Sequence, residues 1–262
     1  MTPDIANFVY LDGRIVKEEV IGVGGAGIVV NRGGYAFKIP RISKLVEIDG
    51  VPVHDRILNH NEDSYNELAV AVTSFRHEKA IYKRLGDRPG IIRCYNVDSE
   101  EPSIQMPLMN GDLRQYLSDF RPERTVQLSW FIQLARAMAF AHTKGVILCD
   151  LRLDNIVYDD KLIDFSESSL MHPEWDLKGC YKYGFSILTD IGQFGAVMFE
   201  ITTGQRCSFD IYEEWQEVGD RRSFFLTLRG LLRGVLRQPV FPSPDSMLLS
   251  VALFVAQSRR SL

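Results

Sequence analysis

The sequence Ile147-Leu148-Cys149-Asp150-Leu151-Arg152-Leu153-Asp154-Asn155 continues through an apolar segment into Lys161-Leu162-Ile163-Asp164-Phe165-Ser166. An apolar run ends at Asp150, an amide follows at Asn155, and a second apolar run ends at Asp164. These are the residue types that phosphoryl transfer requires, because one carboxylate must orient a hydroxyl while an amide and a second carboxylate ligate magnesium.

Two short segments with the composition of strands, residues 156–158 and 161–163, lie on either side of Asp159 and Asp160. A hairpin over these residues would bring Asn155 and Asp164 close together. A buried hairpin with acidic turns remains the alternative interpretation of this stretch when it is taken alone.

The composition of the chain excludes several classes of protein. The chain has 262 residues, a hydrophobic fraction of 45%, a charged fraction of 24% and a net charge of −4. A broad nucleic-acid-binding surface is therefore not expected. Four cysteines lie far apart without a CxxC spacing, which fits reduced thiols rather than a zinc site. We expect a cytoplasmic or nuclear protein with no membrane segment, because no signal pattern begins the chain and the apolar run 247–256 is too short to span a bilayer.

A glycine-rich segment with the spacing G-x-G-x-x-G-x-V occupies residues 22–29. Glycines allow backbone amides to approach phosphate oxygens, although the same spacing also occurs in dinucleotide-binding turns and flexible hairpins. Residues 28–30 continue as a strand rather than a helix, which favours a hairpin lid over a dinucleotide-binding crossover. The next expected strand, residues 35–40, places Ala36 and Lys38 on one face. An exposed lysine on an edge strand is the alternative for Lys38.

Hydrophobic periodicity predicts the remaining elements. Helices are expected over residues 64–85, 113–119, 125–144 and 188–203, with further helices in residues 210–262. Strands are expected over residues 91–97 and 103–107, and residues 41–61 are interpreted as a loop or insertion.

In this order the motifs resemble those of the protein kinase family. The resemblance covers roughly residues 16–205 and implies an α+β, bilobal fold that forms a single kinase domain. The N-lobe, residues 1–107, would be β-rich with one main helix, and the C-lobe, residues 108–262, would be mostly α-helical. Lys38 and Asp164 would then lie on opposite walls of a shared crevice that holds the phosphates.

The resemblance also implies roles for individual residues. Asp150 would accept the proton of the substrate hydroxyl, Arg152 would contact the γ-phosphate, and Asn155 and Asp164 would bind Mg²⁺, with Mn²⁺ as an alternative. Lys38 would bind ATP phosphates and pair with Glu78, with Glu67 as the second choice. The other residues expected at the nucleotide are Gly22, Gly24, Gly25, Gly27, Val29, Met106, Leu108 and Asp112.

Two further positions follow from the resemblance. Gln105 or Met106 would be the gatekeeper beside the nucleotide. Asp190, in the apolar helix 188–203, would anchor the backbone of the catalytic loop, the loop that carries Asp150 and Asn155, because a buried carboxylate needs hydrogen-bond partners. The rival explanation for Asp190 is an acid favoured by the N-terminal dipole of its helix.

The chain departs from the family pattern at several places. Leu148 and Cys149 replace the usual His and Arg, Ser166 replaces a Gly, and the segment 164–189 is short without a clean Ala-Pro-Glu marker. Without the arginine, activity is not expected to need phosphorylation of this segment.

Three functions are compatible with these patterns. The first is ATP- and magnesium-dependent phosphorylation of Ser/Thr hydroxyls in a protein substrate. The alternatives are a pseudokinase that acts as a nucleotide-binding or scaffold module, and a kinase that acts on a small molecule. The position of Arg152 disfavours tyrosine specificity. The sequence assigns neither a particular substrate nor an oligomeric state.

Overall fold

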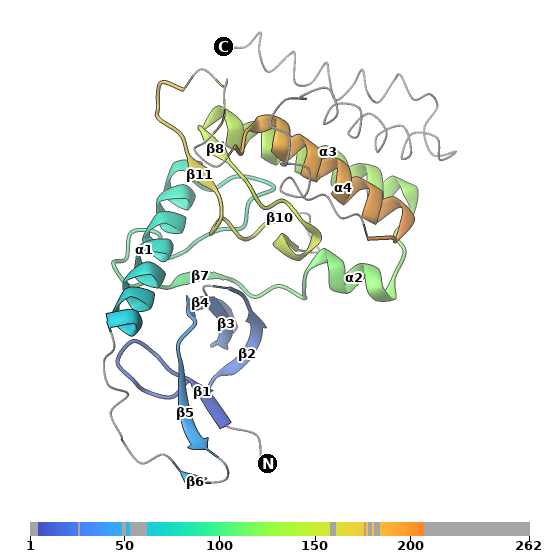
Figure 1. Cartoon of the computed structure of the whole chain (residues 1–262). Helices are drawn as coiled ribbons and strands as arrows, with labels where there is room; N and C mark the ends of the chain where they lie inside the picture. Colours follow the sequence, from blue (N-terminus) through green and yellow to red (C-terminus); the bar gives the residue numbers. More distant parts are fainter. Residues whose placement is uncertain are drawn as a thin grey trace, which may run out of the picture. The chain divides into compact units, whose positions relative to one another are not determined.

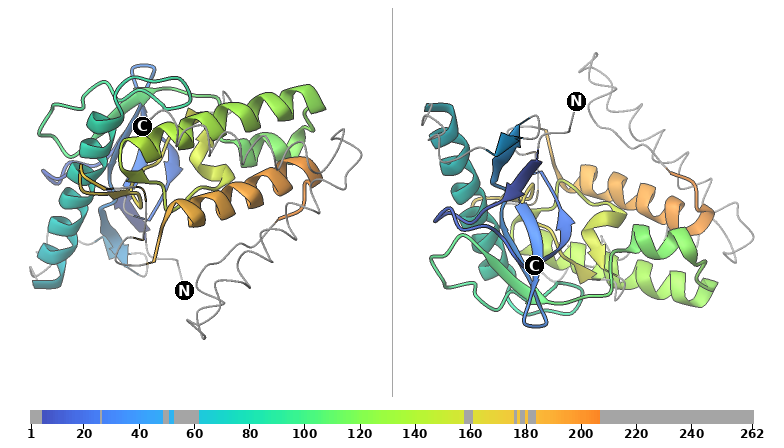
Figure 2. Two further views of the ribbon diagram at one scale, coloured as in Figure 1. Left: turned by 90° about the horizontal axis from the view of Figure 1, so that it is seen from above. Right: turned by 90° about the horizontal axis from the view of Figure 1, so that it is seen from below.

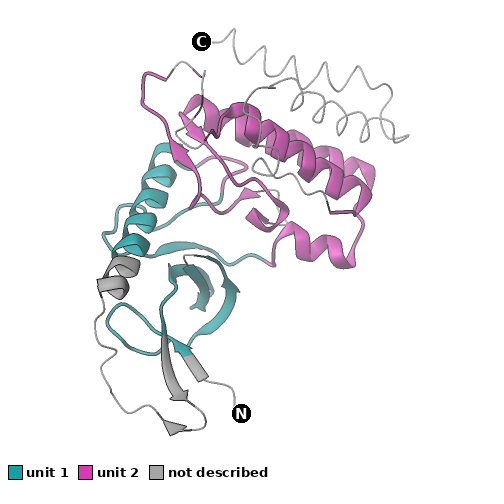
Figure 3. Cartoon of the chain, viewed as in Figure 1, with its two compact units in different colours: residues 1–87, 92–109 teal, residues 88–91, 110–262 magenta. Residues whose placement is uncertain are grey.

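The computed structural model describes residues 5–25, 27–48, 51–52, 62–157, 161–175, 177, 180 and 184–206. The chain divides into two compact units, residues 1–87 with 92–109 and residues 88–91 with 110–262 (Figure 3). The predicted lobe boundary after residue 107 lies close to the break after residue 109, but residues 88–91 belong with the second unit. The predicted helices within residues 210–262 lie outside the described residues.

A four-stranded antiparallel sheet forms the centre of the first unit, in the order β2-β3-β4-β7 (Figure 1). Its strands are β2 (Glu19–Val23), β3 (Gly27–Arg32), β4 (Tyr35–Pro40) and β7 (Ile104–Pro107). Ile28, Val30 and Ile39 on one face form a buried core, against which Phe8 and Val16 pack. Lys38 alternates with Ile39 and therefore lies on the opposite face.

A second sheet occurs where a loop was expected. β1 (Ile5–Phe8), β5 (Ser43–Ile48) and β6 (Val51–Pro52) pair antiparallel in the order β1-β5-β6. The interpretation of residues 41–61 as a loop or insertion is therefore wrong for residues 43–48 and 51–52. The partner of β5 is more than thirty residues earlier in the chain, and such a long-range pairing leaves no local pattern in the sequence.

The strand predicted over residues 91–97 is also absent. Ile91 makes a single bridge to Leu162, and the chain then turns. Tyr95 N–H donates to the Gln105 carbonyl at 2.8 Å, but the Gln105 N–H donates to the side chain of Asn96 at 2.8 Å. The asparagine side chain thus takes the place of a backbone partner and ends the ladder, as Asn commonly does in turns.

One long helix, α1 (Glu62–Leu85), packs against β4 in the first unit. Phe75, Ile81 and Leu85 are buried at helical spacing. The helix ends before Gly86, which has a positive φ of 66°. This element carries Glu78 toward the strand that carries Lys38.

The second unit contains the helices α2 (Leu113–Asp119), α3 (Arg124–Thr143) and α4 (Ile187–Thr203). The helices α3 and α4 lie side by side in all views (Figure 1 and Figure 2). Short strand pairs connect them: β8 (Val146–Ile147) with β11 (Ser169–Leu170), and β9 (Ile156–Val157) with β10 (Lys161–Leu162). The 3-10 helix η1 (Leu153–Asn155) precedes β9. The predicted loop–hairpin unit is present, and it follows α3 directly.

Glycine at the end of α4 is required by both conformation and space. Gly204 has a φ of 72°, which places it in the left-handed region that favours glycine at helix ends. A Cβ atom at this position would also meet the guanidinium group of Arg121.

Candidate active site

Lys38 and Glu78 form a buried ion pair in the first unit. Lys38 Nζ donates to Glu78 Oε2 at 2.9 Å and to Oε1 at 3.1 Å, and the side chains are only 9% and 1% exposed. The predicted contact is therefore present, and an exposed edge-strand lysine is excluded. The alternative partner, Glu67, has a side chain outside the described residues. The catalytic role of the pair stays a prediction.

The glycine-rich segment forms the turn between β2 and β3. Gly24 N–H donates to the Gly27 carbonyl at 2.8 Å, which closes a tight turn. A Cβ atom on Gly27 would lie 3.1 Å from the Ile39 carbonyl oxygen and 3.2 Å from Cζ of Phe75. Close packing therefore requires glycine at position 27, whereas a Cβ on Gly25 would meet no atom within 4 Å. The predicted hairpin is confirmed; phosphate binding by Gly22, Gly24, Gly25 and Gly27 stays a prediction.

Cross-strand register gathers the predicted nucleotide side chains on one face of the sheet. Lys38 is opposite Val29 on β3 and opposite Ile104 on β7, and Ala36 is opposite Met106. Paired residues share a face in an antiparallel sheet. Met106 therefore lies on the Lys38 face and is 7% exposed, whereas Gln105 lies on the other face. The register favours Met106 over Gln105 as the gatekeeper.

Leu108 and Asp112 follow β7 along the chain. Leu108 is 40% exposed, and its contact with the nucleotide stays a prediction. Asp112 is the N-cap of α2, and its Oδ1 accepts the Gln115 N–H at 2.8 Å. Helix capping already explains an aspartate at position 112. A ribose contact by Asp112 stays a prediction.

Asp150 is fixed by the asparagine five residues later. Asn155 Nδ2 donates to the Asp150 backbone carbonyl and to Asp150 Oδ2, both at 2.9 Å. The 3-10 turn η1 between them makes this geometry possible, with Asn155 N–H donating to the Arg152 carbonyl at 2.9 Å. Both amide hydrogens of Asn155 are thus committed to Asp150, and its Oδ1 is the side-chain atom with metal-ligand chemistry.

The charged neighbours of Asp150 and Asn155 have different partners. Arg152 Nε lies 3.2 Å from Asp150 Oδ2, and its side chain is 58% exposed. Asp154 pairs with Arg114 at 2.7 Å, and Arg114 also binds Glu200 at 2.9 Å. This network joins α2, η1 and α4, which gives Asp154 a structural role distinct from that of Asn155.

Asp164 is placed near Asn155 by the backbone. Ile163 N–H donates to the Asn155 carbonyl at 3.1 Å, next to the β9–β10 pair. Asp164 Oδ1 accepts the Ser166 N–H at 2.9 Å, which starts a tight turn over residues 166–167. The hairpin thus brings the segment that carries Asp164 back to Asn155, as the sequence predicted. Magnesium binding by the two side chains stays a prediction.

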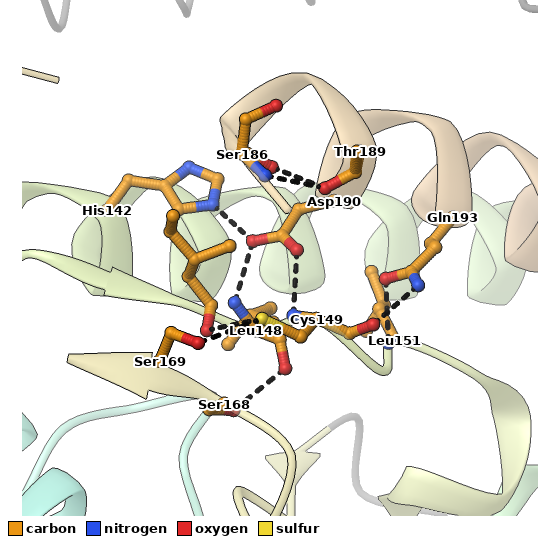
Figure 4. A network of polar contacts seen from close by, with 11 residues as sticks. His142, Leu148, Cys149, Leu151, Ser168, Ser169, Ser186, Thr189, Asp190 and Gln193 are labelled. Atoms are coloured by element: carbon orange, nitrogen blue, oxygen red, sulfur yellow. Dashed lines mark hydrogen bonds and ion pairs between the residues drawn. The ribbon is translucent and has the colours of Figure 1, made fainter. Parts of the chain in front are cut away.

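Asp190 anchors the catalytic loop from inside α4 (Figure 4). Its side chain is fully buried. Oδ2 accepts the Leu148 N–H at 2.8 Å, and Oδ1 accepts the Cys149 N–H at 2.9 Å. The prediction that the loop supplies the partners of Asp190 is confirmed, and the helix dipole alone does not account for this residue.

Sequence reasoning missed two residues that support the loop. His142 Nε2 lies 2.8 Å from Asp190 Oδ2, and Gln193 bonds to the backbone of Cys149 and of Leu151 (Figure 4). Gln193 follows Asp190 by three positions, which places both side chains on one face of the helix. That spacing was a usable signal. His142, in the last turn of α3, had no distinguishing pattern.

Cys149 occupies the position where the family usually has arginine. Its φ is 65°, an uncommon conformation for a residue other than glycine. The thiol is buried, and this burial raises the pKa of Cys149 to about 12. Its Sγ lies 3.5 Å from Ser169 Oγ on β11. Cys94, Cys149 and Cys180 are free thiols.

A lysine–glutamate pair between a strand and a helix, together with an Asp–Asn loop anchored by a helix aspartate, defines the class of protein kinases. The protein kinase domain family model matches residues 53–184. The chain belongs to the protein kinase family, and its α+β fold is that of the family. The matched range contains Glu78, Asp150, Asn155 and Asp164, whereas Lys38 and Asp190 lie outside it.

Two relatives illustrate the similarity. Mitogen-activated protein kinase kinase kinase 11 of Homo sapiens is 27% identical over 217 residues, which cover 72% of this chain and 24% of the relative. The probable serine/threonine-protein kinase fnkB of Dictyostelium discoideum is 30% identical over 139 residues, 50% of this chain and 25% of the relative. The chain thus spans about a quarter of the length of these curated relatives.

Within the described part of the chain, no helix combines the length and the apolar character needed to cross a bilayer. No group of three or more His, Cys, Asp and Glu side chains in that part has the arrangement of a metal site. The predicted magnesium ligands, one amide and one carboxylate, form a smaller set than such a group. Mg²⁺ commonly binds in this way, with phosphate oxygens and waters completing its shell.

Proposed function

We propose that this chain is an active protein kinase domain that transfers the γ-phosphoryl group of ATP to Ser/Thr hydroxyls of a protein. One observation carries the proposal: Asn155 donates two hydrogen bonds of 2.9 Å to Asp150, which orients its carboxylate. A general base must be held in position before it can receive a proton from a substrate.

The residues present fit a magnesium ion. Both amide hydrogens of Asn155 go to Asp150, so the amide oxygen and the carboxylate of Asp164 provide the hard oxygen ligands that Mg²⁺ prefers. When bound, the ion would neutralise negative charge on the phosphates. Mn²⁺ accepts the same oxygen ligands.

The chain's own residues then have distinct tasks. Asp150 would accept a hydrogen bond from the substrate hydroxyl and take its proton at carboxylate oxygen late in the transfer. Arg152 lies beside Asp150 with a mostly exposed side chain, whose guanidinium group is suited to a phosphate. Lys38, held by Glu78, would bind phosphate oxygens of ATP.

A protein substrate with Ser/Thr hydroxyls is supported by two points. The basic residue after Asp150 is at the second position, as in Ser/Thr kinases that this loop resembles. The matched relative in Dictyostelium discoideum is named a probable serine/threonine-protein kinase. A small-molecule substrate is disfavoured by the D-x-x-x-x-G pattern of residues 190–195, which resembles that of protein kinases rather than small-molecule kinases. Its aspartate, Asp190, anchors the loop as this resemblance implies.

The test uses the pure protein with labelled ATP, Mg²⁺ and a mixture of protein substrates. We expect label on Ser and Thr with the wild type and with Asp154→Asn, whose position is occupied by a pair with Arg114. We expect no label with Asp150→Asn. Nucleotide binding without transfer by the wild type would instead indicate a pseudokinase. Turnover that needs an added metabolite would indicate a small-molecule kinase, and equal labelling by Asp150→Asn would overturn the role of Asp150.

A further inference from the structure

The backbone around Asp150 is bound by two side chains of α4, not one. Asp190 accepts the N–H groups of Leu148 and Cys149, the two residues before Asp150. Gln193 acts on the residues directly on either side of Asp150. Its Nε2 donates to the Cys149 carbonyl at 2.7 Å, and its Oε1 accepts the Leu151 N–H at 3.0 Å (Figure 4).

This arrangement accounts for the backbone polar groups next to Asp150. The Asp150 N–H donates to the Leu148 carbonyl at 2.8 Å, and the Asp150 carbonyl accepts Asn155 Nδ2. The Cys149 carbonyl and the Leu151 N–H are both hydrogen-bonded to the side chain of Gln193. Partly buried backbone groups that lose such partners are costly, so Gln193 fixes both peptide units that join Asp150 to the chain.

The conformation of Cys149 makes this support necessary. A residue other than glycine at a φ of 65° is strained, and it persists only where its surroundings hold it. Asp190 holds the N–H of Cys149, and Gln193 holds its carbonyl. The two contacts fix both ends of the strained residue that directly precedes Asp150.

We propose that Gln193 is a positioning residue for phosphoryl transfer, whose amide side chain holds the direction of the Asp150 carboxylate through the two adjacent peptide units. The proposal rests on the proposed function, because it assigns Asp150 the role of the base. Gln193 acts through the backbone and contacts neither substrate nor metal. Its loss therefore lowers the rate of the chemical step more than it weakens nucleotide binding.

The first test compares Gln193→Met with Thr202→Val. Methionine matches glutamine in length without its amide donor or acceptor, and Thr202 on the same helix donates to the Met198 carbonyl one turn earlier. For Gln193→Met we expect kcat to fall about tenfold or more with less than about a threefold change in the Kd of ATP. Thr202→Val should match the wild type in both. A kcat of Gln193→Met equal to that of Thr202→Val would overturn the proposal.

The second test uses Gln193→Glu as a conditional replacement. An ionised glutamate at position 193 still accepts the Leu151 N–H, but its second oxygen faces the Cys149 carbonyl oxygen and cannot donate to it. A protonated glutamate has an O–H group that restores the donor to this carbonyl. We expect the kcat of this variant, divided by the wild-type value at each pH, to rise as pH falls toward about 4. A role limited to helix packing predicts a constant ratio, which would overturn the proposal.

Amide hydrogen exchange separates this proposal from the proposed function. Exchange at Leu151 should be faster by about tenfold or more in Gln193→Met than in Thr202→Val, because only the first loses the acceptor of that N–H. Equal exchange would overturn the role of Gln193 in holding the Leu151 N–H, whatever the activity. An inactive wild type would instead overturn the proposed function, while faster exchange would still support Gln193 as the residue that holds this loop.

Discussion

Lys38 and Glu78 are forty residues apart in the sequence and share two hydrogen bonds, of 2.9 and 3.1 Å, in a site with almost no solvent exposure. A buried pair of this kind is weak evidence for stability, because removing two charges from water offsets much of their attraction. What the geometry shows is that Glu78 fixes the position of the Lys38 ammonium group, which the proposed function assigns to phosphate binding.

The first prediction concerns this pair. Glu78→Gln should lower kcat about 10- to 100-fold with a smaller effect on the Kd of ATP, because Lys38 keeps its charge but loses its fixed position. Steady-state kinetics and equilibrium nucleotide binding measure the two effects. Glu123→Gln is the matched control, since Glu123 is exposed and its side chain makes no capping hydrogen bond. Unchanged turnover in Glu78→Gln would remove Glu78 from this role.

The second prediction concerns magnesium. Asn155→Ala removes an expected ligand and also releases Asp150, so the Mg²⁺ concentration for half-maximal activity should rise about tenfold or more. A magnesium titration of ATP turnover measures this change. Asp154→Asn should leave the midpoint unchanged, because Asp154 is engaged with Arg114. If the two variants had the same midpoint, Asn155 would not be a metal ligand.

The third prediction concerns the anchor of the catalytic loop. Asp190→Asn replaces an acceptor of three groups with an amide that points hydrogens at one or more of the buried N–H donors of Leu148, Cys149 and His142. We expect a loss of about 3 kcal/mol in the free energy of unfolding, measured by urea denaturation. Asp112→Asn is the matched control, because Asp and Asn are nearly equal as helix N-caps. Equal stability of the two variants would contradict the anchoring role.

The sequence predicted the parts of the fold that depend on local pattern and on motif order. The α1, α2, α3 and α4 helices, the glycine hairpin and the β9–β10 hairpin were all predictable, because their periodicity and turns are local. The position of Asp190 within an apolar helix also predicted that its carboxylate would need hydrogen-bond donors. That reasoning found the contact of Asp190 with the catalytic loop.

Other features depend on pairings that leave no local pattern. The strand β5 is recognisable only with its distant partner β1, and the ladder after Ile91 ends because Asn96 supplies a side-chain acceptor. The three-residue spacing from Asp190 places Gln193 on the same helix face, but it does not name the partners of its side chain. These partners are backbone groups of Cys149 and Leu151 that the fold places beside it.

The fourth prediction concerns pH. Burial raises the pKa of Cys149 from 9.0 to about 12, so the folded state favours the neutral thiol. The unfolded chain then loses this proton first as pH rises. The resulting stability is fully present below pH 9.0 and is lost progressively between pH 9.0 and about 12.

Comparison with Cys149→Ala isolates this effect from other groups that titrate at high pH. We expect the free energy of unfolding of the wild type to fall more steeply than that of Cys149→Ala, by at most about 1.4 kcal/mol per pH unit. Parallel curves would show that the thiol is not held neutral. At neutral pH, a thiol-alkylating reagent should label the exposed Cys180 well before Cys149, as peptide mass mapping can check.

The fifth prediction concerns the segment after Asp164. β11 pairs with β8, and Ser168 Oγ donates to the Leu148 carbonyl at 2.8 Å, so hydrogen bonds tie this segment to the catalytic loop. Ser168 and Ser169 are buried, and the thiol of Cys149 cannot bind a phosphate as an arginine does. Phosphatase treatment should therefore leave activity within about twofold of the untreated protein.

Acidic substitutions at a buried and at a half-buried serine distinguish the effect of burying a charge from activation by phosphorylation. Ser168→Asp should lower both stability and activity, because a carboxylate would replace a donor to the Leu148 carbonyl and leave charge in a buried site. Ser166→Asp, at a half-buried turn position, should have a much smaller effect. Activation by Ser168→Asp, or loss of activity on phosphatase treatment, would show that this segment is controlled by phosphate after all.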